Sequence, residues 1–218
     1  HEIILVSSGA IGMGVGKLGL RERPKDIPSK QAAAAVGQCE LMYTYDKLFS
    51  EYHHTVAQLL ITGDDTTNDT RRFNFTNTLN RLLELGALPV INENDTVATD
   101  EIVIGDNDTL AAIVARSVHA DMLILLSDID GLYTADPHTH PEATLLHHVA
   151  RVDDHIREIA GISSSTQGTG GMVTKLHAAD ICLGCGCKMV IANGNNPGNL
   201  YDILEGKTVG TTFSEERL

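Results

Sequence analysis

The sequence predicts an α/β protein in which a mainly parallel sheet carries helices on both faces. Short aliphatic runs alternate with longer helical patterns along the whole chain, and no internal repeat is evident. Apolar residues make up 42% of the 218 residues, whereas aromatic residues make up only 4% and Trp is absent. The core is therefore expected to be aliphatic, and the length suits one large domain or two small ones.

Five runs are expected to form buried parallel strands, because each is short, aliphatic and nearly unbroken. A small hairpin is also expected over 97–103, and the polar C-terminal tail is expected to fray. The five expected strands cover 2–7, 55–61, 88–91, 122–126 and 188–192.

Helical patterns fill the intervals between these strands. Ser29 is expected to cap the first long helix, and Asp69 is expected to cap the second, which ends at Gly86. A third helix opens at 105–108 and reaches about residue 119. The first two of these helices are expected over 29–52 and 70–85, and further helices are expected over 153–160, 172–183 and 200–204.

Charge and composition exclude several classes of function. The formal net charge of −13 argues against nucleic acid as a partner, since a phosphate backbone needs a basic face. No apolar run approaches the ~20 residues of a membrane span. Cys182, Cys185 and Cys187 lie close together, but idle thiols in a reducing cytosol are favoured over a zinc site. A cytoplasmic protein is therefore expected.

The stretch 164–177 carries the clearest chemical signal. Gly168, Gly170 and Gly171 free the backbone to form a concave anion site, and the predicted helix that follows adds its positive N-terminus. Lys175 lies one turn into that helix and adds a full positive charge. The stretch therefore predicts a phosphate site, although its spacing is not that of a P-loop, and a flexible glycine linker is the alternative.

Polar clusters follow at least three of the expected strands, at Ser8, at 92–95 and at Ser127 with Asp128. The carboxyl ends of parallel strands lie on one edge of a sheet, so these clusters are expected to converge. One residue of the group, Asp106 or Asn107, is accounted for as a helix cap. The remaining carboxylates and amides suit a small zwitterion, and the group comprises Asn92, Asn94, Asp95, Asp106, Asn107 and Asp108.

In these stretches the sequence resembles the amino acid kinase family, and within it the glutamate 5-kinase branch. The resemblance implies a three-layer α/β/α sandwich with a mainly parallel central sheet, whose first strand and helix precede His1. Glutamate would bind mainly within 1–120 and ATP mainly within 121–218 of one kinase domain. The matching stretches are VSSGAIG (6–12), SKQAAAAVGQ (29–38), PVINENDTVAT (89–99), GDNDTLAA (105–112), LLSDIDGLYTADP (125–137), GTGGMVTKLHAAD (168–180) and EGKTVGT (205–211).

The resemblance also implies roles for individual residues. Lys175 would reach the transferred phosphoryl group, and Asp108 would orient positive groups around it. Glutamate would be bound by Ser8, Asp95 and Asn107, in a pocket also lined by Gly9, Ala10, Asn92, Asp106 and Asp108. ATP would be bound by Ser127, Asp128, Thr169, Gly170, Gly171, Met172, Val173, Thr174 and Lys175.

The implied reaction transfers the ATP γ-phosphoryl group to the side-chain carboxylate of glutamate, the first step towards proline. A glutamate side chain has a reference pKa near ~4.3 and is already an anionic nucleophile at neutral pH, so charge screening by Lys175 and Mg²⁺ matters more than a general base. Family expectations include inhibition by free proline and assembly as a homodimer or homotetramer. The family's lysine-bearing first strand precedes His1, and the RNA-binding-like C-terminal domain of many bacterial members is not in this sequence.

Two alternatives stand beside this interpretation. A sister kinase would use aspartate, N-acetylglutamate or a nucleoside monophosphate as acceptor, although the INEND and GDND motifs argue against it. A catalytically silent module that binds nucleotide or senses proline is the alternative from another class, motivated by the lysine-bearing strand that the sequence does not contain. His138 and His140 resemble a metal-binding pair, but a proline-flanked surface loop is favoured.

Overall fold

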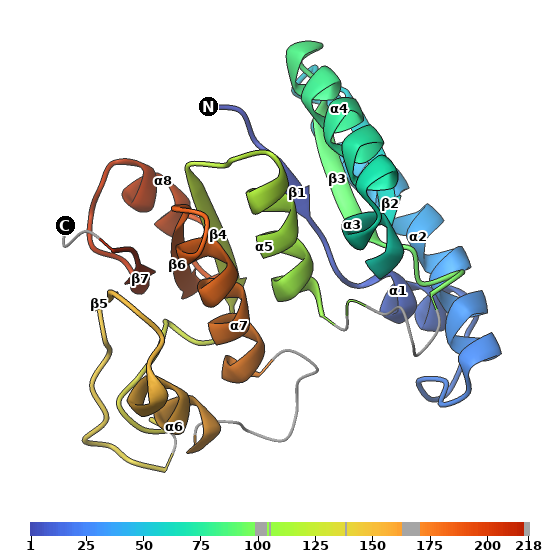
Figure 1. Ribbon diagram of the computed structural model, residues 1–218. Helices are drawn as coiled ribbons and strands as arrows, with labels where there is room; N and C mark the ends of the chain where they lie inside the picture. The colour runs from blue at the N-terminus through green and yellow to red at the C-terminus, as the bar shows by residue number, and fades with distance from the viewer. Residues whose placement is uncertain (99–103, 105, 138, 163–170, 216–218) are drawn as a thin grey trace. The chain divides into compact units, whose positions relative to one another are not determined.

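The computed structural model divides the chain into two compact units, His1–Leu110 and Ala111–Leu218 (Figure 1). The described residues are 1–98, 104, 106–137, 139–162 and 171–215. The α/β class with mainly parallel strand pairing is confirmed, since five strand pairs form among these residues and only one of the five is antiparallel.

The sheet of the first unit has three parallel strands in the order β1-β3-β2. β1 is Leu5–Val6, β2 is Val56–Ile61 and β3 is Leu88–Glu93. The register pairs Val6 of β1 with Ile91 of β3, and Ile61 of β2 with Glu93 of β3. The carboxyl ends of all three strands therefore meet at one edge, which holds two of the three predicted polar clusters, Ser8 and 92–95.

The helices of the first unit cover both faces of this sheet. α1 (Ala10–Lys17) and α2 (Ile27–Ser50) connect β1 to β2, whereas α3 (Gly63–Thr67) and α4 (Asp69–Glu84) lead back to β3. Right-handed crossovers that run in opposite directions place their helices on opposite faces. α2 contacts β2 and α4 contacts β3, which gives the unit a helix–sheet–helix layering (Figure 1).

Two glycines let α1 and α2 approach each other closely. A Cβ atom on Gly14 of α1 would lie 1.8 Å from the carbonyl oxygen of Ala33 in α2. A Cβ atom on Gly37 of α2 would lie 1.7 Å from the carbonyl oxygen of Ala10, in the first turn of α1. Only glycine fits at either position, and this contact holds the N-terminus of α1 against the middle of α2.

The caps of two helices differ from the sequence prediction by one to three residues. α2 begins at Ile27, and its cap is Asp26, which accepts a hydrogen bond from the backbone N–H of Ser29 at 2.9 Å. α4 is capped by Asn68, not Asp69, and the Asn68 side chain accepts from the N–H of Arg71 at 3.1 Å. The predictions that Ser29 and Asp69 are the caps are therefore wrong.

The sheet of the second unit has four strands in the order β4-β6-β7-β5. Its two long strands, β4 and β6, pair in parallel, whereas β7 runs antiparallel to β6. The expected fraying of the C-terminal tail is wrong for β7, which lies between β6 and β5 with all three residues buried. The bounds are β4 Met122–Ser127, β5 His148–Val149, β6 Lys188–Asn193 and β7 Thr211–Phe213.

β6 is buried on both faces. Val190 and Ala192 pack with Ile203 of α8, while the alternating residues Met189 and Ile191 are also fully buried. This double burial explains why the strand is aliphatic along its length and not alternating. The helices of the chain's second half are α5 (Asn107–Ser117), α6 (Asp154–Ile162), α7 (Met172–Leu183) and α8 (Asn199–Leu204). The predicted helix over 172–183 is confirmed at both ends.

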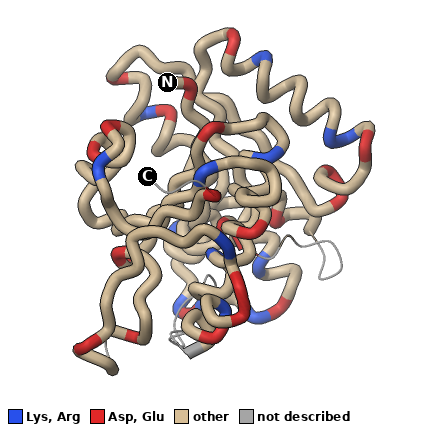
Figure 2. Tube along the Cα trace, turned by 60° about the vertical axis from the view of Figure 1, so that its left-hand side comes forward, with Lys and Arg blue, Asp and Glu red and all other residues tan. Residues whose placement is uncertain are grey.

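Charged residues are spread over the chain and do not gather in one segment (Figure 2). Several lysines and arginines form exposed ion pairs, such as Lys17 with Glu40 at 2.8 Å and Arg81 with Glu84 at 2.6 Å. Such exposed pairs each contribute about 0–1 kcal/mol. Lys175 differs from them, because it is the only charged side chain classed as buried among the described residues.

Candidate functional site

The turn after β1 presents the first group of predicted pocket residues. Ser8 and Gly9 are exposed, and Gly9 has φ 108°, a backbone conformation that favours glycine. Ala10 is buried and begins α1, whose N-cap residue Gly9 supplies no side-chain hydrogen bond. The first turn of α1 therefore keeps its backbone N–H groups uncapped by a side chain, as an anion-binding helix N-terminus requires.

Asn92 is placed beside this turn by the sheet. Continuing the β1–β3 register, the N–H of Ser7 donates to the carbonyl oxygen of Ile91 at 2.9 Å, so the chain around Ser8 lies next to Asn92. Asn92 is 3% exposed. The structure therefore brings Asn92 to the turn formed by Ser8, Gly9 and Ala10, which lies 82 to 84 residues earlier in the sequence.

Two residues of the INEND motif form hydrogen bonds that hold the segment after β3. The carboxylate of Glu93 accepts from the N–H of Ile104 at 2.7 Å. Asn94 closes a turn, in which its carbonyl oxygen accepts from the N–H groups of Val97 and Ala98 and its side chain accepts from the Thr96 hydroxyl. The Asn94 side chain is thus used within the turn, and any contact of it with a ligand stays a prediction.

Asp95 has the electrostatic character of a ligand-binding carboxylate. Burial raises the pKa of Asp95 above its usual value, and the neighbouring Arg23 guanidinium only partly offsets this effect. A carboxylate whose charged form is disfavoured by burial is stabilised by a cation placed against it. The ammonium group of an amino acid would supply that cation.

The GDND motif begins α5, and one of its residues is the cap. Both carboxylate oxygens of Asp106 accept from Thr109, at 2.7 Å from the backbone N–H and 2.9 Å from the hydroxyl. The prediction that Asp106 or Asn107 caps this helix is confirmed for Asp106. Asn107 and Asp108 occupy the first turn of α5, both half-buried, and their roles towards a ligand stay predictions.

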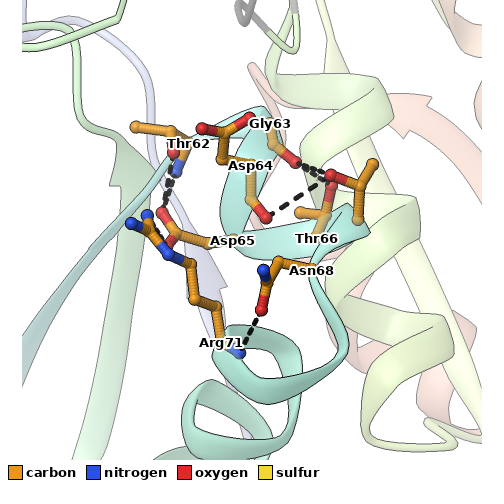
Figure 3. A network of polar contacts seen from close by, with 8 residues as sticks. Thr62, Gly63, Asp64, Asp65, Thr66, Asn68 and Arg71 are labelled. Carbon is orange, nitrogen blue, oxygen red and sulfur yellow. Dashed lines mark hydrogen bonds and ion pairs between the residues drawn. The ribbon is translucent and has the colours of Figure 1, made fainter.

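A polar network at the end of β2 supports the same sheet edge and is absent from the sequence prediction (Figure 3). One carboxylate oxygen of Asp65 accepts from the backbone N–H and the hydroxyl of Thr62, both at 2.8 Å, while the other accepts from Arg71 at 3.2 Å. Burial alone would raise the pKa of Asp65, but these hydrogen bonds outweigh it and lower the pKa. Arg71 thus ties the start of α4 to α3, the short helix after β2.

In the second unit, Ser127 is the last residue of β4 and Asp128 follows it at the sheet edge. The Ser127 hydroxyl donates to the Asp128 carboxylate at 3.2 Å, and the Ser127 carbonyl oxygen accepts from the N–H of Gly194, after β6, at 2.8 Å. Asn193 donates to the Asp130 carboxylate at 2.8 Å and ties the two strand ends together. The edge is thus built from two strands that are parallel neighbours.

α7 starts at this same edge. Only the turn 184–187 separates α7 from β6, so the helix runs back along the strand and its N-terminus lies towards the carboxyl end of β6. Gly171 is the N-cap with φ −67°, not a positive φ, and makes no side-chain hydrogen bond. Thr169 and Gly170 lie outside the described residues. Of the predicted phosphate site, the structure therefore describes Gly171 and the start of α7.

The side chains in the first turn of α7 differ in exposure. Met172 is 7% exposed and Val173 is 56% exposed, while the Thr174 hydroxyl donates to the Gly171 carbonyl oxygen at 2.7 Å. Lys175 is 7% exposed. Lys175 thus lies one turn inside the helix N-terminus, where the sequence places it, and its contact with a phosphate stays a prediction.

The structure also bears on the alternative metal sites. Within the described part of the chain, no three His, Cys, Asp or Glu side chains form a cluster that could hold a metal ion. Cys182 and Cys187 are buried free thiols, and Cys185 is an exposed one. His138 lies outside the described residues. None of the helices that the structure describes has the length and apolar character needed to cross a bilayer.

The amino acid kinase family model matches residues 1–193 of this sequence. This chain belongs to the amino acid kinase family. It is 52% identical to the glutamate 5-kinase of Clostridium tetani, over 98% of this chain and 80% of the relative. It is 50% identical to that of Listeria innocua, over 99% of this chain and 80% of the relative. For the glutamate 5-kinase of Thermoanaerobacter sp., the identity is 51%, and this chain spans 57% of that longer protein.

Solved structures share the fold of this chain at lower sequence identity. Carbamate kinase from Giardia lamblia aligns with a TM-score of 0.65 and 13% identity, over 99% of this chain and 85% of the other. Uridylate kinase from Archaeoglobus fulgidus aligns with a TM-score of 0.63 and 21% identity, over 98% and 85%. These likenesses confirm the amino acid kinase fold and leave the acceptor to be argued from the closer relatives.

Proposed function

We propose that this chain transfers the γ-phosphoryl group of ATP to the side-chain carboxylate of L-glutamate, forming L-glutamyl 5-phosphate and ADP. The observation that carries the proposal is the 52% identity to a glutamate 5-kinase over 98% of the chain. The arrangement of Ser8, Gly9 and Asn92 at one sheet edge, with the half-buried Asp95 on the segment after β3, supports it. These groups match the ammonium and carboxylate of an amino acid.

On the acceptor side, residues of this chain bind glutamate and orient its reacting carboxylate. Asp95 faces the ammonium group, while the N-terminus of α1 and the amide of Asn92 serve a carboxylate. Asn107 and Asp108 extend this pocket from the first turn of α5. The reacting carboxylate is ionised at neutral pH, since its reference pKa is about 4.3, and it needs no general base. Catalysis then depends on in-line positioning and on screening of the negative charge.

On the donor side, the N-terminus of α7 and the Lys175 ammonium group stabilise the phosphates of ATP. Ser127 and Asp128 hold the nucleotide at the end of β4. Lys175 is the group that would contact the transferred phosphoryl oxygens and stabilise the charge that they carry in the transition state. Asp108 orients positive groups in this scheme and removes no proton.

Mg²⁺ is proposed as the companion of ATP. Magnesium bound to a nucleotide is coordinated mainly by phosphate oxygens and water, with one or two carboxylates from the protein. The described residues contain no dedicated metal cluster, which fits an ion brought in by the nucleotide. When bound, the ion neutralises phosphate charge, and we assign it no protein ligand.

The finer parts of the proposal rest on the family resemblance. The product would enter proline synthesis, and free proline would inhibit the enzyme. The protein would act in the cytoplasm as a homodimer or homotetramer. Size-exclusion chromatography with light scattering tests the assembly, and a proline titration of the initial rate tests the inhibition.

The two alternatives have less support. A sister kinase with another acceptor has support only at the level of the fold, at 13% and 21% identity to the carbamate and uridylate kinases. A catalytically silent module is disfavoured, because Asp95, Asp108, Ser127, Asp128 and Lys175, the side chains proposed for glutamate and ATP, are all present.

The test is an acceptor panel with two readouts. Release of ADP is measured with glutamate, aspartate, N-acetylglutamate and UMP, and the acyl phosphate is trapped with hydroxylamine as a hydroxamate. We expect ADP release and hydroxamate with glutamate only. ADP release that requires another acceptor, or no turnover with any acceptor while ATP still binds, would refute the proposal.

A further inference from the structure

Gln38 is a buried residue that none of the proposed steps uses. It lies in α2, is 7% exposed, and follows Gly37, whose close contact with Ala10 holds the first turn of α1. Its Oε1 accepts a hydrogen bond from Nδ2 of Asn92 at 3.0 Å. Gln38 therefore sits where α2, the start of α1 and the end of β3 meet, which is also the proposed amino-acid pocket.

The orientation of both amides is fixed by the backbone. The N–H of Glu93 donates to Oδ1 of Asn92 at 2.9 Å, so Nδ2 is the Asn92 atom that faces Gln38. Nδ2 is a donor, and the Gln38 atom that it meets must be the oxygen. A flip of either amide would set two donors against each other. Nε2 of Gln38 is consequently left to point elsewhere.

Nε2 of Gln38 is the only buried side-chain nitrogen or oxygen, among the described residues, that has no hydrogen-bond partner. An unsatisfied buried donor costs about 1–3 kcal/mol, and native proteins rarely retain one without a reason. A partner that arrives with the substrate supplies that reason. The partner must be an acceptor, because an amide nitrogen donates two hydrogens and accepts none.

The surroundings of Gln38 favour an anion as that acceptor. The uncapped N-terminus of α1 at Gly9 favours negative charge. Gly37, the residue before Gln38, touches the first turn of α1 at Ala10, so the amide of Gln38 belongs to the same corner of the unit. Glutamate offers two carboxylates, of which the side-chain carboxylate must stay open to the phosphoryl donor. The deeply buried position of Gln38 suits the carboxylate that does not react.

We propose that Gln38 donates a hydrogen bond from Nε2 to the α-carboxylate of glutamate, while its Oε1 holds Asn92 in place. The inference rests on the proposed function and adds a residue that recognises the α-carboxylate of the substrate. It assigns to Gln38 a role in substrate selection and none in phosphoryl transfer.

Three variants separate this contact from a packing role. Gln38→Met keeps the side-chain length and removes both polar atoms. Gln38→Glu keeps an acceptor for Asn92 Nδ2 and replaces the donor with an oxygen. Gln58→Met is the matched control, because Gln58 is an exposed glutamine on β2 of the same sheet.

The decisive readout compares glutamate with 4-aminobutyrate, which lacks the α-carboxylate. We expect Gln38→Met to raise the KM for glutamate roughly 10- to 100-fold, as for loss of a hydrogen bond to a charged group. The KM for ATP should stay within about 2-fold, and the inhibition constant of 4-aminobutyrate should change little. Gln58→Met should match the wild type in every constant.

Gln38→Glu adds a pH-dependent readout. A buried glutamic acid donates a hydrogen bond while protonated and repels a carboxylate once ionised. The KM of this variant for glutamate should therefore rise between pH 6 and pH 8, whereas the wild-type KM should not.

Several outcomes would overturn the inference. Equal weakening of glutamate and 4-aminobutyrate in Gln38→Met would show a structural role only. An unchanged KM for glutamate would mean that Nε2 faces a buried water. If Gln38→Met does not fold, the pH profile of Gln38→Glu decides alone. Wild-type protein that does not phosphorylate glutamate refutes the proposed function instead, before any variant is compared.

Discussion

Replacing Gly37 with alanine should push α1 away from α2. The new Cβ atom would lie 1.7 Å from the carbonyl oxygen of Ala10 and 2.4 Å from the backbone nitrogen of Gly14. An ordinary contact begins at 3.4 Å, so the shortfall is about 1.7 Å and the obstacle is backbone on both sides. No rotamer change can relieve the clash, and the helices must separate.

The expected loss of stability follows from two opposing effects. Overpacking of this kind costs about 1–3 kcal/mol or more. The better helix propensity of alanine returns about 1 kcal/mol. The net change is a destabilisation of up to about 2 kcal/mol, which corresponds to a fall in Tm of up to roughly 8 °C for a protein of this size. Because Ala10 begins α1, the displacement should also raise the KM for glutamate.

Thermal unfolding and steady-state kinetics measure the two effects together. The matched control is Gly16→Ala, because Gly16 lies exposed in α1 and a Cβ atom there meets nothing within 4 Å. This control should gain about 0.5–1 kcal/mol from helix propensity. If Gly37→Ala were as stable as Gly16→Ala and bound glutamate normally, the close contact between α1 and α2 would not exist as described.

Three further substitutions test other parts of the molecule. Lys175→Ala should lower kcat by at least 100-fold with a smaller change in the KM for ATP, and an equal loss in both would indicate plain nucleotide anchoring. Asp95→Asn should raise the KM for glutamate at least 10-fold but spare binding of glutarate, which lacks the ammonium group. Burial raises the pKa of Asp95, so stability falls as pH rises from 3.8 through the raised pKa, and Asp95→Asn should increase Tm at pH 7. Asn68→Ala should cost about 1 kcal/mol by removing the cap of α4, whereas Asp69→Ala should cost less, and the reverse order would restore Asp69 as the cap.

Elements whose signal is local could be predicted from the sequence. The helix over 172–183 begins after Gly171, where its pattern starts, and ends where the predicted helix ends. The predicted strands 122–126 and 188–192 are each one residue longer in the structure. Continuous aliphatic runs and helical periodicity depend on near neighbours, which is why these predictions succeed.

Elements that depend on distant partners could not be predicted in the same way. Thr211–Phe213 is short and partly polar, and it becomes a buried strand because β5 and β6 pair with its two edges. The Thr211 hydroxyl accepts a hydrogen bond from the N–H of Leu132, 79 residues away. Nothing in the local pattern of the tail predicts these partners.

The same distinction between local and distant signals applies to the residues of the candidate site. The sequence placed Asn92 and Asp95 in a pocket because polar residues follow a strand, and the strand register supports that placement for Asn92. It treated Asn94 as a further ligand group, although the structure uses this side chain within a turn. Gln38 lies in a stretch that matches the family, but its neighbours in sequence give it no chemical role.

The sequence by itself determined the α/β class, the long helices and strands, and the family to which the chain belongs. Each of these depends on residue type and spacing along the chain. Only the tertiary structure decided that Gly37 touches Ala10 and that Asn92 orients Gln38, 54 residues away. The direction of a hydrogen bond and the space for a Cβ atom are properties of packed neighbours, and packing exists only once distant segments have met.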